Sequence, residues 1–341
     1  MESPDLHQAA RTGQLDLLPA AALTVERLTA RNSSGNTPLH SAAKYGALSV
    51  IPAAVLTAEN LSLRNDSGYT PLHHAALGGH LDQVPAQFLT PDLLGIISNS
   101  GYTVFHVAAA NGHLDQLPAA LLTPALLLQR THLGNTLLHE AAEAGTLDRL
   151  PAVWLTAENL AEPNLGGESV LHVAAFNGHL DQLPPALLTT AALLRKTNTG
   201  DTVIHAAAIS GHLGQIPSAA LTHDNLVLSS KTGFTAIHAA AESGQLDQIP
   251  SDRLTADLLL TRNDNGDTPL HAAAYEGHLD QVPERLLTLE NLNVRNYDRV
   301  SVGRTAINRG FTHQIPPAHR PKEPGPVGRF LTKIGATTPP F

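Results

Sequence analysis

Histidine is the residue type in this chain with the widest chemistry, and it occurs 19 times. Its imidazole can ligate a metal ion or exchange a proton near neutral pH. Eight copies lie three residues after a threonine or serine, and His7 holds the equivalent position near the amino terminus. The eight follow one another at intervals of 33 residues: His40, His73, His106, His139, His172, His205, His238 and His271.

This regular spacing argues against a metal site. If each histidine belongs to its own packed helical unit, successive imidazoles lie about 10 Å apart. The ligands of one zinc ion all lie about 2 Å from a shared centre, which such a row does not provide. We therefore expect these histidines to tie a helix start to neighbouring backbone. A second set follows a helix-ending glycine and is expected to bond local carbonyls: His80, His113, His179, His212 and His278. No metal ion or other cofactor is predicted.

The sequence also carries no pattern that predicts catalysis. It contains no nucleophile–base–acid triad, no glycine-rich phosphate loop and no His-Glu-x-x-His motif. Cysteine is absent, so that neither a disulfide nor a thiolate site is available. The recurring Asp and Glu residues are explained by helix capping and turns. The chain is therefore predicted not to be an enzyme.

The elements that position these histidines recur with a strict period. A proline returns every 33 residues and a glycine precedes each proline by six, giving ten copies without an insertion or deletion. Such a period indicates one small unit stacked on its own copies. We expect one elongated all-α repeat domain over residues 1–316, then a Pro-rich linker and short amphipathic tail over 317–341. The units begin near residues 4, 37, 70, 103, 136, 169, 202, 235, 268 and 301.

One copy, residues 65–97, shows the elements expected in each unit. Thr70 and the proline after it are typical of a helix start, and Gly79 ends that helix. Asp82 is expected to cap a second helix, with a proline in its first turn. Thr90 then opens a third, very short helical turn. An extended crossing leads from there into the next unit.

Several segments resemble the signature of ankyrin repeats: Thr37-Pro38-Leu39-His40-Ser41-Ala42-Ala43 and the matching segments that begin at Thr70 and Thr268. The period is the ankyrin period as well. The resemblance implies an all-α solenoid of about ten helix-turn-helix units, each with a short extra helical turn. It also implies protein binding through a concave inner-helix face and turn tips, without catalysis. The Leu-Asp-Gln-x-Pro second helix and the Leu-Thr-x-x-Asn-Leu turn are atypical, and they predict a shorter outer helix.

The copies differ most at the positions that form the concave face in ankyrin-like units. Aromatic side chains there are favoured binding anchors, and acidic ones favour a partner with a basic patch. The alternative is that these are tolerant, solvated positions. The candidate protein-binding residues are Tyr45, Tyr69, Leu77, Tyr102, Asn111, Glu143, Glu168, Phe176, Asp201, Ile209, Phe234, Glu242, Asp267, Tyr275 and Glu276.

Charge and hydropathy narrow the classes of partner and location. The formal net charge is −9, and because residues 317–341 carry four basic residues and one acid (+3), residues 1–316 carry −12. That balance argues against nucleic-acid binding by the repeats. No apolar run approaches the roughly 20 residues that span a bilayer, and no secretory signal is visible. An intracellular, cytoplasmic protein is expected, while export without an amino-terminal signal stays open.

The tail and the chain ends leave alternatives open. Val327, Phe330, Leu331 and Ile334 form one apolar helical stripe, which either docks on a partner or membrane surface, folds back over the last unit, or stays disordered. The function predicted is a non-catalytic scaffold that binds a protein partner. The alternative is a structural protein whose copies stack end to end into filaments. Polar residues in both terminal units favour a monomer.

Overall fold

The computed structural model describes residues 5–320. The chain divides into two compact units, Met1–Leu188 and Thr189–Phe341, and each is described on its own. Within residues 5–320 the secondary structure is helical, apart from four isolated β-bridges, each next to the start of an inner helix. The predicted tail begins with a 3₁₀ turn, η19 (Pro317–His319), and its apolar stripe lies outside the described residues.

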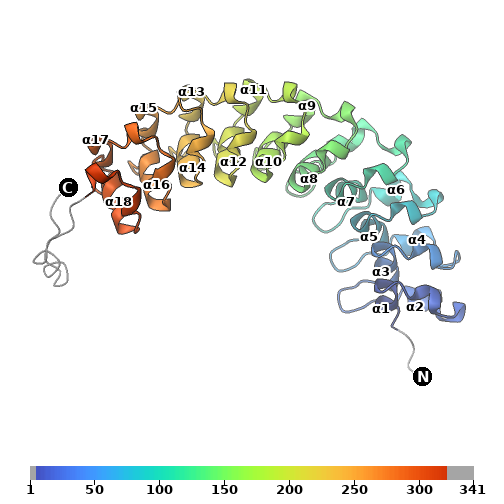
Figure 1. Cartoon of the computed structure of the whole chain (residues 1–341). Coiled ribbons are helices and arrows are strands. Elements are labelled where there is room, and N and C mark those ends of the chain that lie inside the picture. Colours follow the sequence, from blue (N-terminus) through green and yellow to red (C-terminus); the bar gives the residue numbers. More distant parts are fainter. Residues whose placement is uncertain (1–4, 321–341) are drawn as a thin grey trace, which may run out of the picture. The chain divides into compact units, whose positions relative to one another are not determined.

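Short parallel α-helices, called the inner helices here, form the centre of each unit (Figure 1). Neighbouring inner helices pack against each other within each unit. In the first unit they are α1 (Leu6–Arg11), α3 (Pro38–Lys44), α5 (Pro71–Gly78), α7 (Val104–Asn111), α8 (Leu137–Ala144) and α10 (Val170–Asn177). In the second unit they are α12 (Val203–Ser210), α14 (Ala236–Glu242), α16 (Pro269–Glu276) and α18 (Val302–Asn308).

The inner helices begin and end where the sequence predicts. At α5 the Thr70 hydroxyl accepts the His73 N–H at 3.4 Å, and His73 Nδ1 accepts the Thr70 N–H at 3.1 Å. These two bonds satisfy donors that a helix start leaves unpaired. Gly79 ends the helix in the left-handed conformation, with φ 74°. The predictions for Thr70 and Gly79 are thus confirmed.

The second element of each 33-residue copy is helical but differs from the prediction. In place of one α-helix capped by Asp82 there are two 3₁₀ turns, η4 (Leu81–Gln83) and η5 (Ala86–Phe88). Asp82 lies inside η4, so its assignment as an N-cap is wrong. Proline clashes with an α conformation in the residue before it, and Val84 accordingly has φ −76° and ψ 126°. The proline therefore divides the outer helix in two.

The same division recurs in most copies, whereas those with Pro52 and Pro250 have only the first 3₁₀ turn. The first unit has η1 (Leu15–Leu17), η2 (Ala20–Ala22), η3 (Leu48–Val50), η6 (Leu114–Gln116), η7 (Ala119–Leu121), η9 (Leu147–Arg149), η10 (Ala152–Trp154), η11 (Leu180–Gln182) and η12 (Pro185–Leu187). The second unit has η13 (Leu213–Gln215), η14 (Ser218–Ala220), η15 (Leu246–Gln248), η16 (Leu279–Gln281), η17 (Glu284–Leu286) and η18 (Thr312–Gln314).

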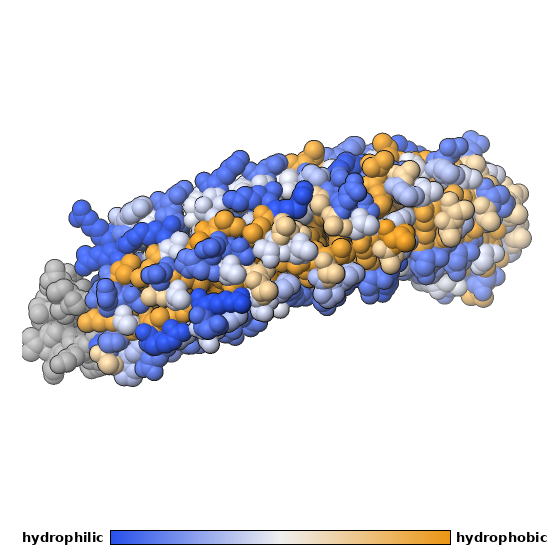
Figure 2. Space-filling model, turned by 90° about the horizontal axis from the view of Figure 1, so that it is seen from above, coloured by the Kyte–Doolittle hydropathy of each residue, from blue (hydrophilic) through white to orange (hydrophobic). Residues whose placement is uncertain are grey.

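A third short helix follows in each complete copy, as expected from its N-cap threonine. In the first unit these are α2 (Val25–Leu28), α4 (Ala58–Leu61), α6 (Pro91–Leu94), the 3₁₀ helix η8 (Pro124–Leu128) and α9 (Ala157–Leu160). In the second unit they are α11 (Thr190–Leu193), α13 (His223–Leu226), α15 (Ala256–Leu259) and α17 (Leu289–Leu292). Figure 2 looks down on Figure 1 from above, so that the short helices α11, α13, α15 and α17 face the viewer. On this outer face, hydrophobic side chains lie between hydrophilic ones.

The core of each copy is made of leucine and alanine. In α5, Leu72, Ala75 and Ala76 are all fully buried, and the equivalent residues of the inner helices from α1 to α16 are buried as well. Because alanine adds only a methyl group, neighbouring inner helices can approach closely. The hydrophobic core thus runs from copy to copy within each unit.

The glutamine of the Leu-Asp-Gln motif joins neighbouring copies. Gln116 accepts the N–H of Leu81 at 2.9 Å and donates to the carbonyl of Gly79 at 2.8 Å. Gln182 and Gln281 make the same two bonds to the preceding copy. We call this pair of bonds the glutamine bridge. It gives the atypical motif a structural role.

The histidines that follow the helix-ending glycines also reach the preceding copy. His179 Nδ1 lies 2.8 Å from the carbonyl of Ala142, so its expected bond to a local carbonyl is wrong. A Cβ built on Gly79 would lie 2.8 Å from the His113 ring. Glycine is needed at this position both for its positive φ and for the space that the ring occupies.

Candidate functional site

The inner-helix face consists of the turn before each inner helix and the last residues of that helix. Buried histidines hold these turns in position. In α16, His271 Nδ1 accepts the N–H of Thr268 at 3.2 Å, and its Nε2 donates to the carbonyl of Val300 at 3.1 Å. One neutral ring therefore fixes both a helix start and the turn of the next copy, as the sequence predicts.

The same bond from Nε2 to a carbonyl of the next copy recurs, and the name histidine ladder is used here for His40, His73, His139, His238 and His271. Within the described residues, Nε2 of His106 and of His205 is buried without a hydrogen-bond partner. Burial lowers the pKa of His40, His73 and His106 from 6.5 to about 4. Burial also lowers the pKa of His139, His238 and His271, so all these rings are neutral near pH 7.

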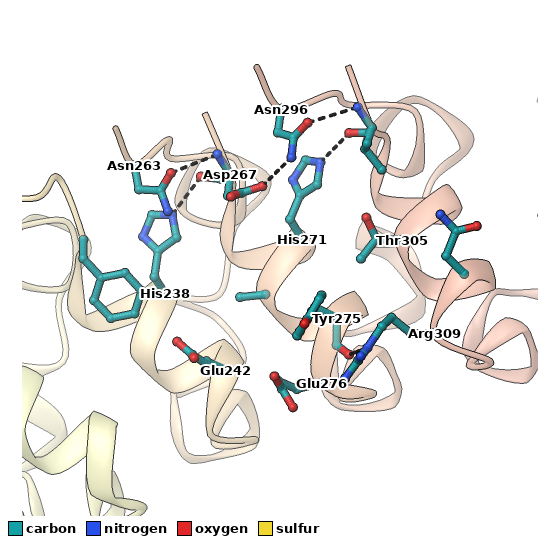
Figure 3. A pocket seen from close by; sticks show the side chains of 14 residues that line it. His238, Glu242, Asn263, Asp267, His271, Tyr275, Glu276, Asn296, Thr305 and Arg309 are labelled. Atoms are coloured by element: carbon teal, nitrogen blue, oxygen red, sulfur yellow. Dashed lines mark hydrogen bonds between the residues drawn. The ribbon is translucent and has the colours of Figure 1, made fainter. Parts of the chain in front are cut away.

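One cavity on this face, in the second unit, gathers five of the predicted site residues. It has a volume of about 440 Å³ and is lined by α14, α16, α18 and the turns before them. We call it the acidic pocket. The predicted residues in its wall are Phe234, Glu242, Asp267, Tyr275 and Glu276. Residues far apart in the sequence thus face one space (Figure 3), because Phe234 and Asp267 hold one position in their copies and Glu242 and Tyr275 another.

Asparagine shapes the rim of the acidic pocket. Asn296 Nδ2 donates to the Asp267 carboxylate at 2.8 Å, while its Oδ1 accepts the N–H of Val300 at 3.0 Å (Figure 3). Asn263 Oδ1 likewise accepts the N–H of Asp267 at 3.0 Å. The turn residues are therefore held in place before any ligand arrives.

Arg309 and Tyr275 lie at the end of the acidic pocket opposite Asn263 and Asn296 (Figure 3). The guanidinium carbon of Arg309 lies 4.0 Å from the centroid of the Tyr275 ring. Arg309 Nε also donates to the Tyr275 carbonyl at 2.9 Å. A cation this close to an aromatic face is attracted by the ring quadrupole. Tyr275 itself remains half exposed.

A second cavity, in the first unit, gathers four predicted residues. Its volume is about 430 Å³, and Tyr69, Leu77, Tyr102 and Asn111 line it. Both tyrosines are half-buried. The Tyr102 hydroxyl donates to the buried Glu140 carboxylate at 2.9 Å. Tyr102 thus bonds a buried residue in addition to lining the cavity.

The remaining candidates are more dispersed. A third cavity of about 430 Å³ in the second unit includes Asp201, Ile209 and Phe234 in its wall. Four candidates line none of these three cavities: Tyr45, Glu143, Glu168 and Phe176. Of these, Tyr45 and Phe176 are exposed, and the Glu168 carbonyl accepts a bond from His139 of the ladder. The sequence thus predicts one continuous face, whereas in the structure most of the candidate residues line three separate cavities.

Some residues of the site were not predicted from the sequence. Glu140 is a buried acid whose two oxygens accept bonds from Tyr102 and Asn135, and burial raises its pKa. Arg309 is not among the candidate residues that the sequence predicts. Its position over Tyr275 depends on packing between copies, which a linear pattern does not reveal. Asparagine recurs at this turn position in five copies, and this recurrence was the one available signal for Asn263 and Asn296.

Neither metal coordination nor a membrane span is found in the part of the chain that the structure describes. Among residues 5–320, no three His, Asp or Glu side chains are grouped so that they could hold a metal ion. No helix among those residues is both long and apolar enough to cross a bilayer.

Comparison with known families gives two matches. The family model described as ankyrin repeats (3 copies) matches residues 6–89 and 171–250. The model described as ankyrin repeat matches residues 265–297. No curated protein matches the chain significantly. The matched segments include all five predicted residues of the acidic pocket.

Proposed function

Because the chain belongs to the ankyrin-repeat family, whose repeats generally mediate protein–protein interaction, we propose that its inner-helix face binds a protein partner. The observation that carries the proposal is the acidic pocket, where a cavity of about 440 Å³ combines aromatic side chains with carboxylates. Aromatic residues in such hollows are favoured anchors for a partner. The charge of the repeats favours a partner with a basic surface.

Exposed apolar side chains support the same face. Leu77, Phe176, Ile209 and Tyr275 occupy equivalent positions near the ends of four inner helices, and each is between 41% and 51% exposed. A partner that covers them removes apolar surface from water at little conformational cost. Ankyrin-repeat proteins are typically non-enzymatic scaffolds, and the proposed role needs no catalytic group.

The experiment replaces these four side chains with serine in the full-length chain. Affinity capture followed by crosslinking mass spectrometry then compares the variant with the wild type. The control replaces four exposed apolar residues outside the candidate face: Leu17, Leu128, Val153 and Leu289. We expect crosslinks to the inner-helix face that the first variant loses and the control keeps. Equal loss in both variants would contradict the proposal, and circular dichroism checks that each variant remains folded.

A further inference from the structure

The acidic pocket differs in charge from the other two cavities of the inner-helix face. Glu242, Asp267 and Glu276 contribute three carboxylates and Arg309 one guanidinium, which gives a formal charge of −2 with the histidines neutral. The cavity at Tyr69 has no acidic residue in its wall, and the cavity at Ile209 has Asp201 balanced by Lys231. Only the acidic pocket among the three therefore presents a net negative charge.

Two of its carboxylates are available to a ligand. Neither Glu242 nor Glu276 forms an ion pair or a side-chain hydrogen bond within residues 5–320. Both side chains are exposed, and they come from neighbouring helices, α14 and α16. Figure 3 shows them at the same end of the pocket. A cation bound there would meet two acids held on rigid helices.

The aromatic wall adds a preference for a planar cation. Phe234 and Tyr275 both line the pocket, and the Tyr275 ring already attracts the guanidinium of Arg309. A guanidinium stacks on aromatic rings and pairs with carboxylates in a two-bond geometry that an ammonium does not provide. Arg309 lies over Tyr275 and forms no ion pair with Glu242 or Glu276 among the described residues, so that both carboxylates stay open to a second cation.

From this arrangement, and on the basis of the proposed protein-binding role, we infer that the acidic pocket binds an arginine side chain of the partner. The cavity of about 440 Å³ is larger than one side chain, so the residues next to the arginine also enter it. The ligand class is thus an arginine-containing peptide segment with apolar neighbours. Glu242 and Glu276 bind the guanidinium, and Phe234 and Tyr275 contact its flat surface and the adjacent residues.

The test measures binding of a synthetic peptide to the full-length chain by fluorescence anisotropy. The probe is a fluorescein-labelled peptide with one arginine between two leucines, and its control carries citrulline, which has nearly the same shape without the charge. We expect citrulline to weaken binding by about tenfold or more, and added salt to weaken the arginine peptide. Equal binding of the two peptides would overturn the inference. Equal binding of a lysine peptide would overturn the preference for a guanidinium.

Variants of the chain locate the site. E242Q/E276Q is expected to weaken the arginine peptide by about tenfold, while D280N/E284Q, which removes two exposed charges outside the acidic pocket, leaves it unchanged. If the peptide binds only after the basic tail residues are neutralised in R329Q/K333Q, the chain's own tail is the occupant and the assignment to a partner fails. A partner captured on the inner-helix face with undiminished affinity by E242Q/E276Q would refute this inference and leave the proposed function standing. If the peptide binds but no partner contacts the face, the proposed function fails separately.

Discussion

The Nε2 atom of His271 lies 3.1 Å from the carbonyl oxygen of Val300, in the turn of the next copy. Since Nδ1 of the same ring accepts the Thr268 N–H, the ring must carry its single proton on Nε2. A protonated ring would place a second proton against the Thr268 N–H. Each contact of the histidine ladder therefore depends on a neutral imidazole.

Stability should fall as the pH is lowered. The folded pKa of His40, His73 and His106 is about 4, below the ordinary 6.5, so the unfolded chain binds more protons between these values. Their contribution is complete above pH 6.5 and is lost as the pH falls toward 4. We expect a loss of about 1 kcal/mol for each histidine between about pH 7 and about pH 5.5. Urea unfolding at several pH values measures it, and H73Q, which cannot titrate, should show a shallower dependence. An unchanged midpoint across this range would contradict the prediction.

Loss of a glutamine bridge should destabilise the copy before it. In Q116L, the Leu81 N–H and the Gly79 carbonyl both lose their side-chain partner. Leaving such groups unpaired costs about 1–3 kcal/mol, seen as a lower urea midpoint. Q248L is the matched control, because the exposed Gln248 side chain bonds only the adjacent Asp247 among the described residues. Equal effects of the two substitutions would show that the bridge contributes nothing.

The contact between Gly79 and the His113 ring predicts a steric effect beyond backbone strain. G79A places a methyl group 2.8 Å from the ring, whereas a Cβ at Gly211 meets no atom within 4 Å. Both glycines have a positive φ, so G211A controls for the left-handed backbone. We expect G79A to lower the melting temperature more than G211A does. In a double-mutant cycle, H113A should recover part of the loss, and simple additivity would argue against the contact.

The bond between Tyr102 and Glu140 predicts a cost for removing one hydroxyl. Y102F leaves one oxygen of the buried carboxylate without its donor. A lost hydrogen bond to a charged group costs about 1.5–3 kcal/mol. Y45F removes a hydroxyl from an exposed tyrosine and should cost almost nothing. Thermal unfolding of the two variants compares them directly, and a Y102F chain as stable as Y45F would rule out this structural role.

The sequence predicts what is local and repeated better than what joins one copy to another. The caps at Thr70 and Gly79 are confirmed because the side chains that form them lie within a few residues of each helix end. The second helix was wrong in detail at Asp82, since the restriction that proline places on Val84 outweighed the capping preference. The position of Arg309 over Tyr275 needed contacts between residues 34 apart. The aromatic and acidic residues at the variable positions predict a face, but its separate cavities depend on packing between copies.

The glutamine bridges at Gln116, Gln182 and Gln281 each reach back to the preceding copy, over constant offsets of 35 and 37 residues. If one complete 33-residue module were excised, the next glutamine would meet the same backbone groups in the module upstream. Loss of a single residue inside a module would instead misalign the amide with both of its targets. The protein should therefore tolerate changes of length in whole modules and resist any other.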